Sequence, residues 1–317
     1  MRFINSKKKC FIAILFFCYY SATSQKIIDH KSYNSWCKIK NEKISSDGTV
    51  LHYEISPLKG DSRLIVHFLE TSKIDTFNCS KNAVFSEKSN IIAFRKTISY
   101  DRLRNLKLKK KEKFKAPKDS LCIYFLKKDS LIFIPELEKY KMSEENNLLG
   151  YLYKAKKKTK KKKRFFKRRK KVDTSKKKYG FNLKIIDDQN KIVWEAEQTM
   201  IFCFSKKGKY LAYIQKKEKD SLLLNIIDLD QRKATINLNY QKIFALPVWN
   251  EDESVVAFKH CNDSIKEEEN YLFSTYEFSS KNKRTYGSKD NTIFNNYAIS
   301  EKEKLTFSSK KKSSVAP

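Results

Sequence analysis

The sequence predicts an all-β fold, a β-propeller built from about six four-stranded antiparallel blades. A short motif recurs along the chain: a Ser or Asn is followed by polar turn residues and, five positions after it, by three or four apolar residues. The distances between successive motifs, 41 to 62 residues, resemble a propeller repeat, and the two longest contain basic stretches. The six motifs begin at Ser45, Ser86, Ser143, Ser205, Asn250 and Ser300.

Each motif predicts an antiparallel hairpin. A strand such as Met200–Phe204 or Ala245–Trp249 enters the turn at the Ser or Asn. A pair such as Asp47-Gly48 or Lys207-Gly208 reverses the chain, and the apolar run leaves antiparallel to the first strand. The first five units end in an aromatic residue at the ninth position: Tyr53, Phe94, Tyr151, Tyr213 and Phe258.

A third and a fourth strand are expected after each hairpin. Segments such as Leu183–Trp194, Leu222–Lys233 and Tyr271–Lys283 are apolar at both ends and carry a polar turn between them. Apolar residues come in runs of three to five rather than at helical spacing, so no long helix is expected. An irregular all-β sandwich with chance similarity at its turns is the alternative, and six recurrences favour the propeller.

The end of the sequence raises the question of ring closure. The chain ends shortly after the sixth motif, so its last blade would lack outer strands. We expect either that residues 26–40 supply a strand to this blade, or that the chain is a fragment of a longer protein.

Residues 1–24 have the three parts of a secretory signal peptide. Arg2 and three lysines precede an apolar run from Phe11 to Tyr20, and small residues lead up to Gln25. A membrane anchor is the alternative, but this run is shorter than the roughly 20 residues that span a bilayer. We therefore expect an exported protein, periplasmic or extracellular, with residues 25–317 as one propeller domain and no transmembrane segment after cleavage.

The formal net charge of +32 is concentrated in two stretches. Residues 154–178 hold 17 Lys and Arg against Asp173, and residues 102–118 hold nine against Glu112; the rest of the chain carries only +8. Like charges at this density repel one another, so both stretches are expected as solvated loops inserted into blades. Such loops would bind polyanions such as nucleic acid, lipopolysaccharide or anionic lipid. The favoured interpretation is a permissive loop without a specific nucleic-acid partner.

No residue pattern predicts catalysis, a cofactor or a metal. Five cysteines remain after signal cleavage (Cys37, Cys79, Cys122, Cys203 and Cys261), without CxxC spacing, and most are expected as small apolar residues on buried strands. The four histidines, His30, His52, His67 and His260, are dispersed, which favours core or surface roles. The sequence contains no G-x-S-x-G, no HExxH and no phosphate-binding glycine loop.

The blade units resemble a known family. The pattern S-x-x-G-x-x-L-A-Y followed by L-x-I-x-D-L occurs from Ser205 to Leu229, within a stretch, Phe202–Lys233, that looks like a middle blade. Trp36–Val66 looks like a first blade. Both are similar to the N-terminal propeller of the exported bacterial branch of the prolyl oligopeptidase and dipeptidyl peptidase group. The resemblance covers nearly the whole mature chain.

This resemblance implies a role in a serine peptidase. In that group the propeller caps a separate C-terminal α/β-hydrolase domain with a Ser-Asp-His triad and restricts access to peptides. This chain has no position that matches the triad, so it is expected to be the substrate-gating portion and inactive alone. The alternatives are a stand-alone exported propeller that binds a protein or peptide partner at one face, and polyanion binding through the Lys-rich stretch.

Overall fold

The computed structural model describes residues 36–109, 116–154, 180–217, 221–240, 242–243, 246–261, 272–287, 292–299 and 305–311. The predicted signal peptide, nearly all of the basic stretch 154–178, and Ser300 lie outside these ranges. Most described residues belong to β-strands, and consecutive strands pair antiparallel into sheets.

The first two sheets each contain four strands in chain order. The first sheet is β1 (Cys37–Ile44), β2 (Val50–Pro57), β3 (Arg63–Phe68) and β4 (Ile74–Asn78). The second sheet is β5 (Ser80–Phe85), β6 (Ile91–Lys96), β7 (Ser120–Phe125) and β8 (Ser130–Ile134). This is the four-stranded unit that the recurring motif predicts.

The third and fourth sheets share one long strand. They comprise β9 (Leu137–Met142), β10 (Leu149–Tyr153), β11 (Phe181–Ile186), β12 (Ile192–Phe204), β13 (Tyr210–Lys216), β14 (Leu222–Asp228) and β15 (Lys233–Tyr240). The first half of β12 pairs with β11 and its second half, from Thr199, pairs with β13. Gln198, at φ 57°, marks the change of direction. The seven hydrogen-bonded strands are therefore two successive four-strand units.

The last strands form one broken sheet and one hairpin. The short strands β16 (Lys242–Ile243) and β17 (Val248–Trp249) both pair with β18 (Val255–Cys261), which β19 (Leu272–Glu277) and β20 (Asn282–Gly287) follow. Strands β21 (Thr292–Ile299) and β22 (Leu305–Lys311) pair with each other.

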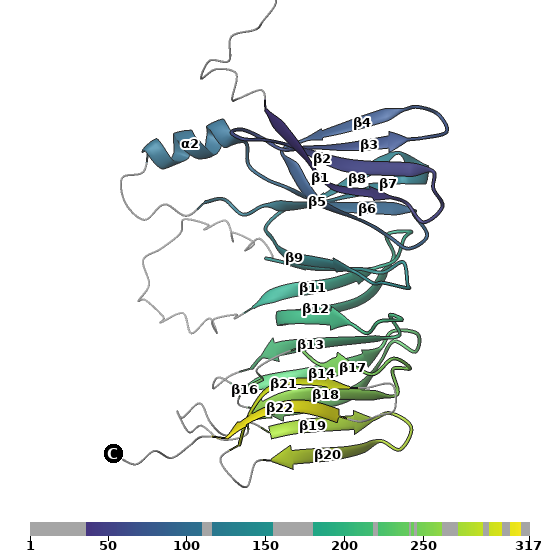
Figure 1. Cartoon of the computed structure of the whole chain (residues 1–317), viewed down its shortest axis with the longest axis vertical. Helices are drawn as coiled ribbons and strands as arrows, with labels where there is room; N and C mark the ends of the chain where they lie inside the picture. The colour runs from purple at the N-terminus through teal and green to yellow at the C-terminus, as the bar shows by residue number, and fades with distance from the viewer. Residues whose placement is uncertain are drawn as a thin grey trace, which may run out of the picture.

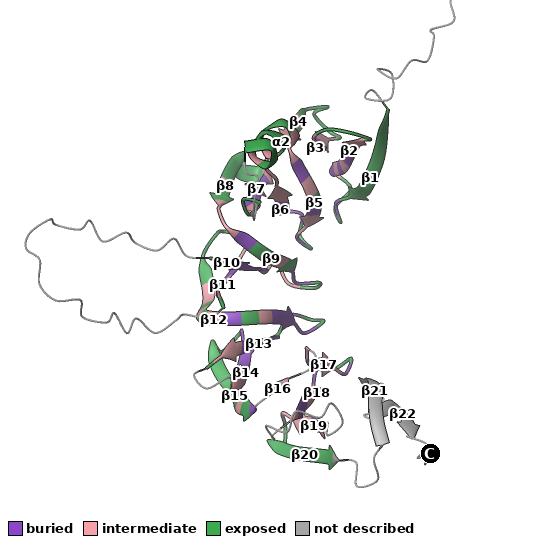
Figure 2. Cartoon of the chain, turned by 90° about the vertical axis from the view of Figure 1, so that its left-hand side faces the viewer, coloured by how far each residue is buried: buried purple, intermediate pink, exposed green. Residues whose placement is uncertain are grey.

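These sheets are the blades of a β-propeller arranged along an open arc (Figures 1 and 2). The first strand of each sheet, such as β1, β5 or β9, lies on the concave side, and the last strand lies outside (Figure 2). The first sheet stands at one end of the arc, and β20 lies near the other. Residues 37–40, part of the segment 26–40 considered for closing the last blade, instead pair with β2 in the first strand of the first sheet.

The recurring Ser or Asn is buried in five described turns, where its side chain holds the turn closed. The Ser45, Ser86 and Ser205 hydroxyls accept the backbone N–H five residues later, at 2.9–3.2 Å. Asn250 does the same through Oδ1, at 2.9 Å from the Val255 nitrogen. The Ser143 hydroxyl instead accepts the Asn146 N–H. Short polar side chains at turns make such local bonds readily, which explains why the motif recurs.

Neighbouring turns are also joined to one another. The N–H of Ser46 donates to the Ser89 hydroxyl at 3.1 Å, and the N–H of Lys88 donates to Asn147 Oδ1 at 2.7 Å. Further along the arc, the N–H of Lys207 donates to Glu253. These bonds join the turns at Ser45, Ser86 and Ser143 in one series, and the turns at Ser205 and Asn250 as a pair.

Apolar side chains from facing sheets fill the space between blades. Of the aromatic residues at the ninth motif position, Phe94, Tyr151, Tyr213 and Phe258 are buried, and Tyr53 is half-buried. Gly150 on β10 lies against the Phe202 ring, where a Cβ would come within 2.5 Å of Cε2. The predicted apolar runs are therefore the inter-blade core.

One basic stretch differs from expectation. Residues 102–109, expected within a solvated loop, belong to the helix α2 (Tyr100–Lys109), although no residue of α2 is buried. Leu, Lys and Arg are strong helix formers, and Asp101 in the first turn and Lys107 and Lys109 in the last complement the helix dipole. The prediction of a loop from charge density was therefore wrong for residues 102–109.

The five cysteines are all free thiols and differ in exposure. Cys122 on β7 and Cys203 on β12 are buried, as expected, and burial raises their pKa values to about 11 and about 12. Cys37 is exposed because β1, at the end of the arc, has all eight residues exposed. Among the described residues, no helix is long and apolar enough to cross a membrane.

Candidate functional site

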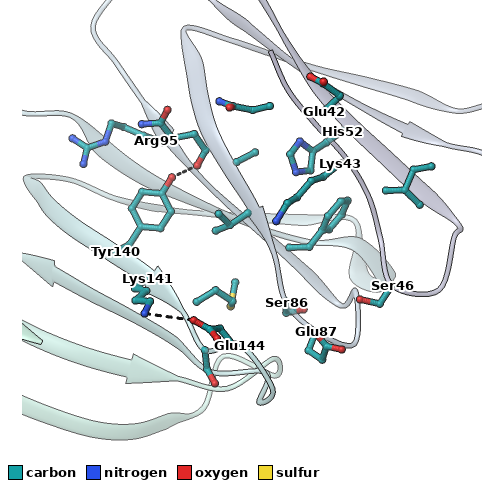
Figure 3. Close-up of a pocket in the computed structure, with 18 of the residues that line it drawn as sticks. Glu42, Lys43, Ser46, His52, Ser86, Glu87, Arg95, Tyr140, Lys141 and Glu144 are labelled. Atoms are coloured by element: carbon teal, nitrogen blue, oxygen red, sulfur yellow. Dashed lines mark hydrogen bonds and ion pairs between the residues drawn. The ribbon is translucent and has the colours of Figure 1, made fainter. Parts of the chain in front are cut away.

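A cavity of about 940 Å³ opens between the first strands of the first three sheets (Figure 3). Its walls come from β1, β5 and β9 and from the turns that follow them, on the concave side of the arc. Ile44, Phe85 and Met142 contribute apolar surface. The charged lining residues are Glu42, Lys43, Glu87, Arg95, Lys139, Lys141 and Glu144.

Two asparagines shape the strands that line this cavity. Asn41 in β1 and Asn82 in β5 have positive φ angles of 51° and 57°, and each lies four residues before its turn serine. Asparagine tolerates this left-handed conformation better than most residues. At both positions the pairing register shifts, as in a β-bulge. Bulges redirect the side chains that follow them.

The bulge in β1 decides which charge lies beside His52. Lys40 pairs with Glu54, but the next paired residue on β1 is Lys43, opposite His52. Uninterrupted pairing would place Glu42 opposite His52. Directly opposite residues share a face with Cβ atoms about 5 Å apart. The extra residue therefore places a lysine, rather than a glutamate, beside the imidazole.

The Glu54 side chain, two residues after His52 on β2, forms a hydrogen bond that links the first sheet to the second. Its side chain is 2% exposed, and Oε1 accepts hydrogen bonds from Asn41 Nδ2 at 3.1 Å and from the Ala83 N–H at 3.2 Å. Ala83 follows the bulge residue Asn82, where the pairing of β5 with β6 is interrupted. The Glu54 carboxylate on β2 therefore satisfies a backbone N–H that this pairing leaves unbonded.

Tyr140 on β9 connects the third sheet to the same bulge. Its hydroxyl donates to the Asn82 carbonyl, a contact drawn as a dashed line in Figure 3. Burial raises the pKa of Tyr140, so the hydroxyl remains protonated as a donor. Arg95 on β6 pairs with Asp119 at 3.1 Å and donates to the Glu138 carbonyl at 3.2 Å. Side chains of three sheets thus hold this wall of the cavity in place.

His52 is the unusual member of the lining. It is 0% exposed and packs against Phe85 with ring centroids 4.7 Å apart, yet neither ring nitrogen has a hydrogen-bond partner among the described residues. Burial, with a smaller contribution from the Lys43 charge, lowers the pKa of His52 to about 4. At neutral pH the ring is uncharged and presents one N–H donor and one acceptor. Buried polar atoms are normally satisfied, so this imidazole needs an explanation.

Neither of the other two histidines that the structure describes lines this cavity. His67 on β3 is half-buried. His260 on β18 is buried, and its Nε2 lies 2.8 Å from the Ser274 hydroxyl, which in turn lies 2.9 Å from that of Thr285. Both residues are buried, and the pair ties the neighbouring strands β18 and β19 together. His30 is outside the described ranges.

The alternation of inward and outward residues in β2 could have pointed to His52, although motif searches do not use this pattern. Val50, His52 and Glu54 are the inward residues of β2, and two of these three are polar. A glutamate is rarely fully buried unless it is paired, so its place on the inward face singles out this strand. The part of the chain that the structure describes contains no group of His, Cys, Asp and Glu side chains that could hold a metal ion.

Comparison with known proteins gives weak structural likenesses. No protein-family model and no curated protein sequence matches the chain. The β-propeller domain of the Trilobed protease from Pyrococcus furiosus aligns over 87% of this chain and 80% of its own, with TM-score 0.43 and 9% identity. Hydrazine synthase of Kuenenia stuttgartiensis aligns over 84% and 72%, with TM-score 0.39 and 12% identity.

An enzyme of known class is among these structures. The acylaminoacyl peptidase of Pyrococcus horikoshii aligns over 90% of this chain but 44% of its own, with TM-score 0.42 and 10% identity. The chain therefore spans less than half the length of that peptidase. At these TM-scores and identities the likenesses carry no argument about this chain.

Proposed function

We propose that the chain is the substrate-gating propeller of an exported peptidase of the prolyl oligopeptidase group, non-catalytic alone, and that its concave cavity receives peptides. The observation that carries the proposal is the cavity of about 940 Å³ between the first strands of three successive blades. The blade-like sequence units and the open arc of four-stranded sheets support it.

The cavity suits a short, chemically mixed ligand. Its volume lies in the range of small-molecule sites, roughly 300–1,000 Å³, so it admits a few residues of an extended chain and excludes a folded domain. Apolar Phe85 and Met142 can pack against side chains, while lysines and glutamates can pair with charged groups. Selection by size in this way is what gating of a peptidase requires.

Export is part of the proposal and has its own test. The first 24 residues have the composition of a cleavable signal. When the full chain is produced in a bacterial host, the mature protein should be recovered from the periplasm or medium with Gln25 as its first residue. Uncleaved protein in the cytoplasm would contradict export without affecting the argument from the cavity.

Peptide binding and turnover can be measured on the same sample. We expect the full chain to bind a pooled library of fluorescein-labelled tetrapeptides, detected by fluorescence polarisation, and to leave chromogenic dipeptide and prolyl-peptide substrates uncleaved. Lys139→Trp should weaken binding at least tenfold, because Lys139 lines the cavity and the indole would fill it. Lys127→Trp is the matched control, an exposed lysine outside the lining.

Each other outcome has a defined meaning. Turnover would contradict the non-catalytic assignment. Equal loss in both tryptophan variants would show that peptides bind elsewhere. Failure to bind any peptide would overturn the proposed role and favour a stand-alone propeller whose partner is a folded protein.

A further inference from the structure

The imidazole of His52 is an unsatisfied group in a cavity wall. It is fully buried from bulk solvent and borders the cavity, and neither of its nitrogens has a hydrogen-bond partner among the described residues. Because these nitrogens have no exposed surface, a ligand in the cavity completes this hydrogen bonding only when the ring turns toward the cavity. A group that accepts a hydrogen bond from the ring N–H is therefore the simplest occupant.

The positive charge of Lys43, beside His52, indicates which kind of hydrogen-bond acceptor a ligand would present here. Lys43 lies directly opposite His52 in the strand pairing and also lines the cavity. Figure 3 shows the Lys43 side chain next to the His52 ring. The bulge at Asn41 creates this pairing by displacing Glu42, which would otherwise face the ring. An ammonium group and a neutral N–H donor on one wall are complementary to an anion with two acceptor oxygens.

Nearby carboxylates do not already fill this role. Glu54, two residues from His52 on the same face, is bonded through Oε1 to Asn41 and Ala83. Glu144, across the cavity, lies 3.9 Å from Lys141. Neither carboxylate is therefore bonded to Lys43 or His52, and an anion in the cavity can bind them.

We propose that Lys43 and His52 bind the C-terminal carboxylate of a peptide held in the cavity. This proposal rests on the proposed function for the peptide and on the pairing of Lys43 with His52 for the carboxylate. Phe85, which stacks on His52, and Met142 then provide apolar surface for the last side chains of the peptide. Specificity for a free C-terminus would restrict the cavity to peptide ends.

The test compares peptides that differ only in their terminal group. The full chain is titrated with two fluorescein-labelled tetrapeptide libraries, one ending in a free carboxylate and one in an amide. We expect the free-acid library to bind at least tenfold more tightly. His52→Phe, which keeps a ring without nitrogens, and Lys43→Met should each reduce this ratio at least threefold. His52→Gln, which retains an N–H donor, should preserve more of the ratio than His52→Phe.

Lys38→Met is the matched control, because Lys38 is an exposed lysine of the same strand that does not line the cavity. Its ratio should equal that of the wild type, and circular dichroism checks that every variant is folded. Equal affinity for both libraries would overturn the carboxylate site while leaving peptide binding intact. The same conclusion follows if the ratio survives both Lys43→Met and His52→Phe.

Competition separates the two sources of a carboxylate. Acetate and succinate should displace the free-acid library only at concentrations far above those of the peptides. If they compete as well as peptides do, the carboxylate site stands but its assignment to peptides is overturned. If neither library binds, the proposed function fails and this inference fails with it.

Discussion

Glu54 Oε1 accepts a hydrogen bond from the backbone N–H of Ala83 at 3.2 Å, so a side chain of the first sheet completes the backbone of the second. Both residues are buried, and the same oxygen also accepts from Asn41 Nδ2. Removing a carboxylate that satisfies buried donors leaves them without partners, which costs about 1–3 kcal/mol for each donor that water cannot reach.

Glu54→Ala should therefore lower the free energy of unfolding by about 2–3 kcal/mol, measured by urea denaturation with circular dichroism. Glu54→Gln keeps an oxygen acceptor of the same length, so its loss should stay within about 1 kcal/mol. If both variants lose the same amount, the bond to Ala83 does not contribute to stability.

The motif residues test how far local sequence determined the fold. Ser205→Ala should lower the free energy of unfolding by about 1–2 kcal/mol, because it leaves the buried Tyr210 N–H without the Ser205 hydroxyl, now 2.9 Å away. Lys206→Ala in the same turn is the control, since Lys206 is exposed and its change should stay within about 0.5 kcal/mol. Equal midpoints in urea for the two variants would contradict this role for the serine.

Two turn glycines separate backbone strain from packing between blades. Gly48 and Gly208 have similar φ angles, 72° and 74°. A Cβ on Gly48 meets nothing within 4 Å, whereas one on Gly208 would lie 2.4 Å from the Ser143 hydroxyl oxygen in the neighbouring turn. Gly48→Ala should cost about 1 kcal/mol from backbone strain, and Gly208→Ala at least about 1 kcal/mol more.

Thermal unfolding of the two variants checks this difference directly. Each carries the same substitution at the same turn position, so the excess loss in Gly208→Ala reports the contact with Ser143. A melting temperature as high as that of Gly48→Ala would show that the turns of adjacent blades are not closely packed.

The sequence predicted those parts of the fold that local chemistry determines. A Ser or Asn five residues before an apolar run predicted the hairpin, since the hydroxyl or amide oxygen of that residue reaches the N–H at the start of the run. The chain order of the strands followed from the same repeat.

The cavity could not be predicted in this way. It depends on one extra residue in β1, Asn41, which changes the partner of His52 from Glu42 to Lys43. Alternation of polar and apolar residues does not reveal such a shift in a strand that is exposed throughout. The contact of Glu54 with Ala83 joins residues 29 positions apart in different blades, and no local pattern indicates it.

His52 gives stability a pH dependence whose sign follows from its burial. The pKa of His52 is lowered to about 4 in the folded protein, against about 6.5 in an unfolded chain. Between these values the unfolded state binds more protons, so the free energy of unfolding falls as the pH decreases. The contribution is fully present above pH 6.5, and the part lost between pH 7 and 5 is about 2 kcal/mol.

Urea denaturation at pH 7 and pH 5, in buffers free of carboxylates, measures this loss. Carboxylate side chains and the other histidines also titrate, so the informative quantity is the difference between the wild type and His52→Gln, which lacks the ionisable ring. The wild type should lose about 2 kcal/mol more than this variant over the interval. Lys43→Met should lose less than the wild type, because removing the neighbouring positive charge raises the pKa of His52. Parallel losses in the wild type and His52→Gln would mean that the imidazole is hydrated or already protonated in the folded protein, and that the cavity wall is not built around a neutral His52.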